Sequence, residues 1–182
     1  MSAYRDDANV AALHARLADI VADAPADDLI AAAEPYRDVP EIAGPLYERV
    51  VADQPNNARA LVVLASAYWV HGRGPEVVGE LAARAMAADP ENRGAWHLWA
   101  LTESSPRARV QRWQQVSRRF PEDDLARANL ADNAASLAGA EHDPVALALA
   151  LETYTTLRER ATVDAQRTAL DQAITTLKSW RL

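Results

Sequence analysis

Apolar residues recur along this chain at the three- and four-residue spacing of an α-helix, and prolines separate one such stretch from the next. Five prolines fit the first turn of a helix, where the missing N–H is not needed: Pro25, Pro40, Pro75, Pro106 and Pro144. Three more fit the position just past a helix end: Pro55, Pro90 and Pro121. The pattern predicts helices over about 7–23, 26–37, 41–53, 57–71, 75–88, 92–104, 106–119, 123–138, 144–160 and 163–181.

One segment also has the alternation of a β-strand. Residues 144–157, PVALALALETYTTL, place Val145, Leu147, Leu149 and Leu151 at every second position. Alanine fills the positions between them and is depleted in strands, and no partner strand is evident. We therefore predict a helix that is apolar on all sides because it is buried between two others.

An internal repeat organises these helices. Three times a proline follows an aromatic or small residue by eight positions, in the pairs Tyr47 and Pro55, Ala82 and Pro90, and Trp113 and Pro121. The prolines are 35 and 31 residues apart, within the period of roughly 20 to 50 residues that is typical of stacked helical hairpins. Short connections make neighbouring helices antiparallel. The predicted fold is an all-α solenoid of stacked antiparallel helical hairpins.

Composition agrees with an all-α domain and narrows the chemistry. The chain is 49% hydrophobic with only 6 glycines, a balance that favours a core of close-packed helices. It has no cysteine, which excludes a disulfide framework and thiolate metal sites. Asp6 and Asp7 stand where a secretory signal needs positive charge, and the longest apolar run, 145–151, is shorter than the roughly 20 residues of a membrane helix. We expect a cytoplasmic protein without a membrane span.

Residues 57–90 resemble a tetratricopeptide hairpin. The first helix has that family's run of large, large, small and aromatic residues at Leu61, Leu64, Ala65 and Tyr68, and the second ends on Ala85, Met86, Asp89 and Pro90. Residues 93–121 look like a shortened second copy, a third begins at Asp124, and an incomplete copy precedes them. The resemblance implies one domain over 1–182, with divergent N-terminal helices in 1–40, repeat hairpins in 41–160 and a capping helix in 162–182. The hairpins of this family form a right-handed superhelix.

The family binds its partners in a concave groove lined by the first helix of each hairpin. By resemblance, the groove residues are Arg59, Val62, Ser66 and Trp69 from the first copy, His97 and Leu101 from the second, and Leu125, Ala128 and Asp132 from the third. Trp69 has two interpretations, as an exposed anchor for a partner or as a packing residue against the next hairpin. We assign Trp96, Trp99 and Trp113 to the core. The implied function is a non-catalytic adaptor that binds a protein or peptide, or a second copy of this chain.

A basic helix supports an alternative function. Arg107, Arg109, Arg112, Arg118 and Arg119 lie within 13 residues that contain no acid, and such a cluster can bind a nucleic-acid backbone. The net charge is nevertheless −7, and acids in residues 1–50 or in 122–124 can neutralise these arginines. A solvated helix is the favoured interpretation.

Little in the sequence points to catalysis. The four histidines are scattered, no glycine-rich phosphate loop follows a strand, and Glu141, His142 and Asp143 are consecutive, so they do not converge readily on one metal ion. Asp143 also has the position of a helix cap. We expect no cofactor and no metal, and a helical ligand-binding or enzyme domain is the remaining alternative.

Overall fold

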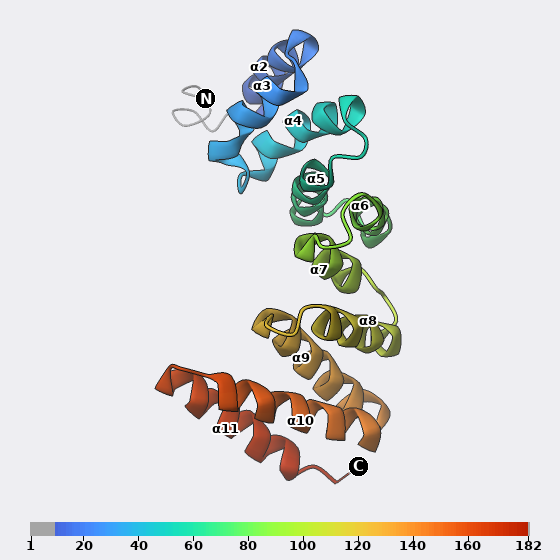
Figure 1. Ribbon diagram of the computed structural model, residues 1–182, viewed down its shortest axis with the longest axis vertical. Helices are drawn as coiled ribbons and strands as arrows, with labels where there is room; N and C mark the ends of the chain where they lie inside the picture. Colours follow the sequence, from blue (N-terminus) through green and yellow to red (C-terminus); the bar gives the residue numbers. More distant parts are fainter. Residues whose placement is uncertain (1–9, 182) are drawn as a thin grey trace. The chain divides into compact units, whose positions relative to one another are not determined.

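The computed structural model describes residues 10–181, and every regular element among them is helical (Figure 1). In chain order the elements are α2 (Val10–Asp23), α3 (Ala26–Ala33), the 3₁₀ helix η1 (Glu34–Tyr36), α4 (Pro40–Asp53), α5 (Ala58–Val70), α6 (Pro75–Ala88), α7 (Arg93–Leu101), α8 (Pro106–Arg119), α9 (Asp124–Glu141), α10 (Pro144–Arg160) and α11 (Asp164–Lys178). The all-α prediction is confirmed. The expected start of the first helix, 7–9, lies outside the described residues.

A short local signal repeats at three helix junctions. The helices α4, α6 and α8 each end two residues before a proline of the repeat, and the next helix is capped two residues after that proline. The caps are Asn57, Asn92 and Asp123, whose side-chain oxygens accept hydrogen bonds from the backbone N–H groups of the following turn. These bonds satisfy donors that an α-helix leaves without internal partners. At each of these junctions, the signals that end one helix and begin the next therefore lie within a few residues of each other.

Two prolines outside the predicted roles alter the N-terminal helices. Pro35 lies in η1, so the helix expected over 26–37 ends at Ala33 and continues as one 3₁₀ turn. Pro45 lies inside α4, where it removes the N–H that would bond to the carbonyl of Glu41. The helix persists through this position because Ile42, Leu46 and Val50 bury one of its faces.

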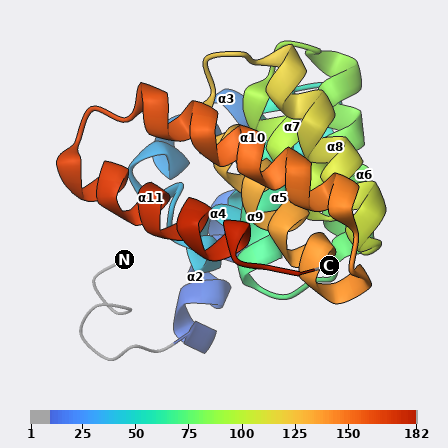
Figure 2. The ribbon, with the colours of Figure 1, turned by 90° about the horizontal axis from the view of Figure 1, so that it is seen from below.

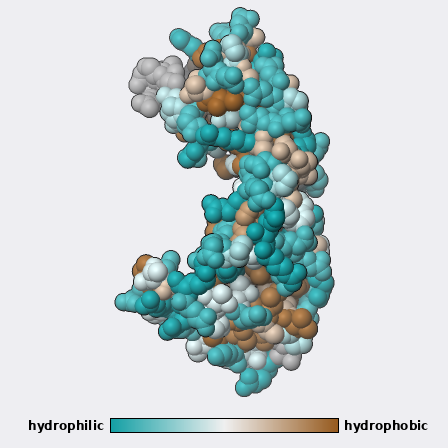
Figure 3. Space-filling view, viewed as in Figure 1, coloured by the Kyte–Doolittle hydropathy of each residue, from teal (hydrophilic) through white to brown (hydrophobic). Residues whose placement is uncertain are grey.

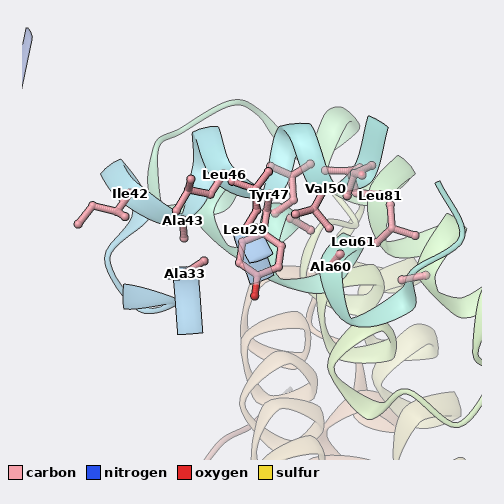
Figure 4. Packing of buried hydrophobic residues seen from close by; sticks show 14 of the residues in the cluster. Leu29, Ala33, Ile42, Ala43, Leu46, Tyr47, Val50, Ala60, Leu61 and Leu81 are labelled. Carbon is pink, nitrogen blue, oxygen red and sulfur yellow. The ribbon is translucent and has the colours of Figure 1, made fainter. Parts of the chain in front are cut away.

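The described residues form two compact units, one up to Thr102 and the other from Glu103 onward. In the first unit α4 packs on α2, α3 and α5, while α5 and α7 both pack on α6 and on each other. Its core includes Leu29, Tyr47 and Leu61, each at most 1% exposed (Figure 4). Ala65 and Ala82 are fully buried, and their small side chains allow the close approach of α5 and α6.

The second unit is a run of four helices in which α8 packs on α9, α9 on α10 and α10 on α11. Figures 1 and 2 both show α11 alongside α10. Within each unit the consecutive helices from α3 onward are thus packed as neighbours, and the solenoid fold class is confirmed. The two helices of the predicted hairpin 93–121, α7 and α8, belong to different units. That residues 1–182 form one domain remains a prediction.

The three tryptophans assigned to the core differ in burial. Trp113 is 2% exposed and packs in the second unit as predicted. Trp96 and Trp99 are only half-buried: Trp99 packs against the core of the first unit from its edge, whereas the assignment was wrong for Trp96. Their rings meet edge to face with centroids 5.6 Å apart, and Trp96 Nε1 donates to the carbonyl of Pro90 at 2.9 Å. The Trp96 indole therefore packs at the surface against Trp99, which itself borders the core.

The helix α10 is less buried than its apolar sequence predicts. It does lie between two helices, and its buried positions include Ala146, Ala150 and Leu157. Val145, however, is 77% exposed, and Leu149 is half-buried. Ala146 and Ala150 face inward because their small size lets helices approach, which leaves larger apolar side chains on the open side. Figure 3 shows apolar surface on the side of this unit where α10 begins.

Candidate functional site

In the first unit the predicted groove residues mostly serve packing and local bonding. Arg59 Nη2 donates to both carboxylate oxygens of Glu34, at 2.9 and 2.8 Å. A Cβ atom on Gly94 would lie 3.1 Å from Val62 Cγ1, which shows how closely α5 and α7 approach there. Ser66 Oγ donates to the carbonyl of Val62 at 2.8 Å. The helices α5 and α7 are therefore in close contact at Val62 and Gly94.

Trp69 is the exception in this unit. Its side chain is 40% exposed, and the next residue, Val70, is 71% exposed. His97 and Leu101, the predicted groove residues of α7, are half-buried. The end of α5 therefore presents an apolar surface. A cavity of about 280 Å³ lies beside it, lined by Tyr68 and His71 together with residues of α4, but Trp69 itself does not line that cavity.

In the second unit the corresponding helices are separated. Both α9 and α11 pack on α10 rather than closely on each other, and two cavities lie between them. The first, here called the Leu125 cavity, has a volume of about 520 Å³ and is lined by Leu125, Ala128, Leu157, Arg160, Ala169 and Leu170, among others. The second, the Asp132 cavity, has about 420 Å³ and is lined by Asp132, Ala135, Tyr154, Ala173, Leu177 and Trp180, among others. We call the two together the α9–α11 groove.

The C-terminal end of α11 closes one end of this groove. Trp180 lies so close to α9 that a Cβ atom on Gly139 would be 3.3 Å from its indole ring. Leu177, at 4% exposure, is the most deeply buried side chain of α11. Arg158 of α10 and Asp171 of α11 form an ion pair at 3.0 Å on the outer side. The ion pair joins α11 to α10 and Trp180 contacts α9 at one end, while a space remains between α11 and α9 along the rest of the groove.

The charges differ between the two cavities. At the Leu125 cavity, Arg160 pairs with Glu122 and Asp124, both at 2.7 Å, and its hydrogen bond lowers the pKa of the Glu122 carboxyl. At the Asp132 cavity, Tyr154 Oη donates to Asp132 Oδ1 at 2.5 Å. Burial, followed by this hydrogen bond, raises the pKa of Tyr154. Among the described residues no cation pairs with Asp132, so its negative charge stays uncompensated.

Most of the basic helix is engaged within its own unit. Arg107 pairs with Glu141 at 2.5 Å and with Asp143 at 2.8 Å. Arg109 Nε donates to the carbonyl of Glu103 at 2.6 Å, and Arg112 pairs with the carboxylate of Glu103 at 2.7 Å. A hydrogen bond from the backbone N–H of Ser105, together with these arginines, lowers the pKa of Glu103. Arg118 and Arg119 are exposed near the end of α8.

The acidic and histidine residues at the α9–α10 turn have structural roles. Asp143 is the N-cap of α10 and accepts hydrogen bonds from Val145 N at 2.9 Å and Ala146 N at 3.1 Å. His142 ends α9 in the left-handed conformation, with φ 52°. Within residues 10–181 no three or more His, Asp or Glu side chains are placed to hold a metal ion. No helix of that part of the chain is both long and apolar enough to span a bilayer.

Sequence reasoning found one wall of the groove and missed the other. Leu125, Ala128 and Asp132 were predicted from the resemblance, and the structure brings all three to the α9–α11 groove. The α11 wall, with Leu170, Ala173 and Trp180, was interpreted as a cap. The structure shows that this cap is incompletely buried, since Leu170 and Ile174 are only half-buried and Val163 is 53% exposed. A cavity of about 380 Å³ between α8 and α10, lined in part by Val110, Val145 and Leu149, was also missed.

Comparison with known proteins supports the fold. No protein-family model matches the sequence, and no curated protein matches it significantly. Solved structures do match, among them the crystal structure of MamA protein, with a TM-score of 0.58 and 17% sequence identity. That match covers 74% of this chain and 70% of the other. At such identity the likeness concerns the fold alone, and together with the helix pairing it shows a tetratricopeptide-like helical repeat.

Proposed function

We propose that this chain is a non-catalytic interaction module that docks a protein partner in the α9–α11 groove. The observation that carries the proposal is a pair of apolar cavities between α9 and α11. The corresponding helices of the first unit, α5 and α7, pack on each other instead. Leu125 borders the first of the two cavities and is 62% exposed. Covering one such leucine stabilises a complex by up to about 2 kcal/mol. An exposed apolar surface with a polar rim is typical of a protein-binding site.

The face is also the one that the resemblance implies. The helix α9 is the first helix of the predicted third hairpin, and its residues Leu125, Ala128 and Asp132 belong to the predicted partner-binding groove. Trp69, exposed at the end of α5, is proposed as an additional anchor on the first unit. Arg59, Val62, Ser66, His97 and Leu101 remain predicted groove residues, although Arg59 already pairs with Glu34.

No observation favours the alternatives to a comparable extent. The arginines at 107, 109 and 112 are bonded to acids or carbonyls of their own unit, which reduces the positive field that nucleic-acid binding requires. The proposal assigns no catalytic residue and needs no cofactor. A cytoplasmic location and self-association into a homodimer remain predictions.

A matched pair of variants tests the proposal. Leu125 and Val145 are both exposed, and both follow an Asp N-cap by two residues, with their N–H groups bonded to that Asp at 3.1 and 2.9 Å. Leu125→Asp and Val145→Asp therefore perturb equivalent helix starts, but only the first places a charge in the groove. We expect proteins crosslinked to the full chain in its host to be lost with Leu125→Asp and retained with Val145→Asp.

If the crosslinked proteins are instead lost with Val145→Asp and retained with Leu125→Asp, the partner binds at the cavity between α8 and α10. Equal recovery of every crosslinked protein with both variants would overturn the docking proposal altogether. Circular dichroism of the two variants provides the folding control.

A further inference from the structure

The α9–α11 groove has a spacing that limits what can fill it. The Leu125 cavity is bordered on α9 by residues in 124–128 and the Asp132 cavity by residues in 132–136, eight positions later. With a rise of 1.5 Å per residue, the two cavities are about 12 Å apart along α9. A helical ligand spans this distance with residues seven or eight positions apart. An extended ligand spans it with residues about four positions apart.

Most of the polar side chains that line the groove already have partners within their own unit. Asp124 of α9 pairs with Arg160 at 2.7 Å, and Asp132 accepts a hydrogen bond from Tyr154 Oη at 2.5 Å. On the opposite wall Thr176 Oγ1 donates to the carbonyl of Gln172 at 2.9 Å. The described polar residues of the lining that make no such bond include Ser136, Thr162 and Gln166. The groove therefore offers few partners to an incoming peptide backbone.

This shortage discriminates between the two kinds of ligand. About four residues of extended chain would bring about eight backbone donors and acceptors into the groove, and each one buried without a partner costs about 1–3 kcal/mol. A helix satisfies its own backbone and presents only side chains. Apolar cavities between helices with little polar lining therefore favour a helical ligand.

The charges indicate where the ligand carries a cation. At the Leu125 cavity the carboxylate of Asp124 already pairs with Arg127 and Arg160. At the Asp132 cavity the carboxylate of Asp132 has the phenol of Tyr154 as its partner and no cation within the described residues. Trp180 lines the same cavity and offers an aromatic ring that attracts cations. An aliphatic side chain suits the first cavity, and a positively charged one suits the second.

We propose that the α9–α11 groove binds an amphipathic α-helix of a partner protein. An aliphatic residue of that helix fills the Leu125 cavity, and a lysine or arginine seven or eight positions away reaches Asp132. This inference rests on the proposed function, since it specifies the partner of the same groove. It assigns the partner's secondary structure, the spacing of its two anchors and the sign of its charge.

Selection from a random library of 16-residue peptides on the immobilised full chain tests the inference, with the Leu125→Asp protein used to remove peptides that bind elsewhere. We expect the enriched peptides to have apolar residues at helical spacing and a Lys or Arg seven or eight positions from an aliphatic residue. Their circular dichroism should become helical on binding. Enriched peptides with apolar residues at every second position, or rich in proline, would overturn the helical partner while the docking surface stands.

If no enriched peptide depends on Leu125, both this inference and the proposed function fail. Enrichment of extended or proline-rich peptides overturns only this inference, so the two failures are distinguishable.

A charge exchange tests the cation separately. In fluorescence anisotropy, Asp132→Lys should weaken the selected peptide by about tenfold, and replacing the peptide's cation with Glu should restore affinity. Glu159→Lys, which makes the same change of charge on an exposed residue of α10 that lines neither cavity, is the control and should bind like the wild type. Unchanged affinity with Asp132→Lys would overturn the assigned cation.

Discussion

The indole of Trp180 lies against Gly139, close enough that a Cβ atom on Gly139 would be 3.3 Å from two of its ring atoms. Gly139 is in the last turns of α9, and Trp180 follows α11, so this contact joins the two walls of the groove at one end. It also explains why a glycine is found within a helix, where it is otherwise unfavourable.

Replacing Gly139 with alanine tests how tightly this end is held. Alanine is favoured over glycine inside a helix by about 1 kcal/mol, whereas the new Cβ would press on the ring. Because Trp180 lies outside α11 and is only half-buried, we expect it to shift by a few tenths of an ångström. Urea unfolding should then show a gain of up to about 1 kcal/mol. A loss of similar size would show that Trp180 is held rigidly.

Replacing Ala65 with leucine should overpack the contact between α5 and α6. Ala65 is fully buried, and a larger side chain there forces neighbouring helices apart or into poor rotamers. We expect a loss of about 1–3 kcal/mol in the free energy of unfolding. Ala83→Leu, on the exposed side of α6, is the control and should change stability by no more than about 0.5 kcal/mol. Equal stability of the two variants would contradict the packing.

The stability of the first unit should depend on Tyr68 at alkaline pH. Burial, then the hydrogen bond that Tyr68 Oη donates to Glu48 at 2.7 Å, raise the pKa of Tyr68 from 10.0 to about 12. Because the folded state favours the neutral phenol, this contribution is complete below about pH 10 and is lost as the pH rises towards 12. In thermal unfolding between those values, Tyr68→Phe should lose stability less steeply than the wild type. Parallel curves would show that the phenol ionises freely in the folded protein.

The helix start at Asp143 should weaken in acid. Hydrogen bonds from the backbone of α10, above all from Ala146, and the guanidinium of Arg107 lower the pKa of Asp143. The stabilisation is therefore present above the ordinary aspartate pKa of 3.8 and is lost as the pH falls through the lower folded value. Asp143→Asn keeps a good N-cap without the charge. Its unfolding midpoint should vary less with pH than that of the wild type below about pH 4.

The fold was predictable because its signals are local. Prolines and apolar spacing place every helix, and small residues such as Ala65 and Ala131, both fully buried, mark where helices touch. The exceptions follow from tertiary packing. Pro45 continues α4 because one face of that helix is buried, and Trp96 stays at the surface because it pairs with Trp99. Neither the burial of that face of α4 nor the contact between the two tryptophans can be predicted from the spacing of residues in the sequence.

The groove was predictable only on the α9 side. A resemblance to a repeat family identifies the face of a helix that its partners use, and it therefore pointed to Leu125 and Asp132. It contains no information on the distance between α9 and α11, because that distance depends on where Trp180 and Leu177 settle against the rest of the unit. The pairing of Arg107 with Glu141, 34 residues later in the chain, was hidden for the same reason.

The junctions at Pro55, Pro90 and Pro121 allow such a chain to gain or lose hairpins during evolution. Each combines termination of one helix with initiation of the next in about five consecutive residues, and the same arrangement recurs at all three. A stretch cut at two of these points has compatible ends. Duplication or deletion between them would lengthen or shorten the array by one hairpin without requiring new turn sequences, and the faces of the helices would remain free to diverge for different partners.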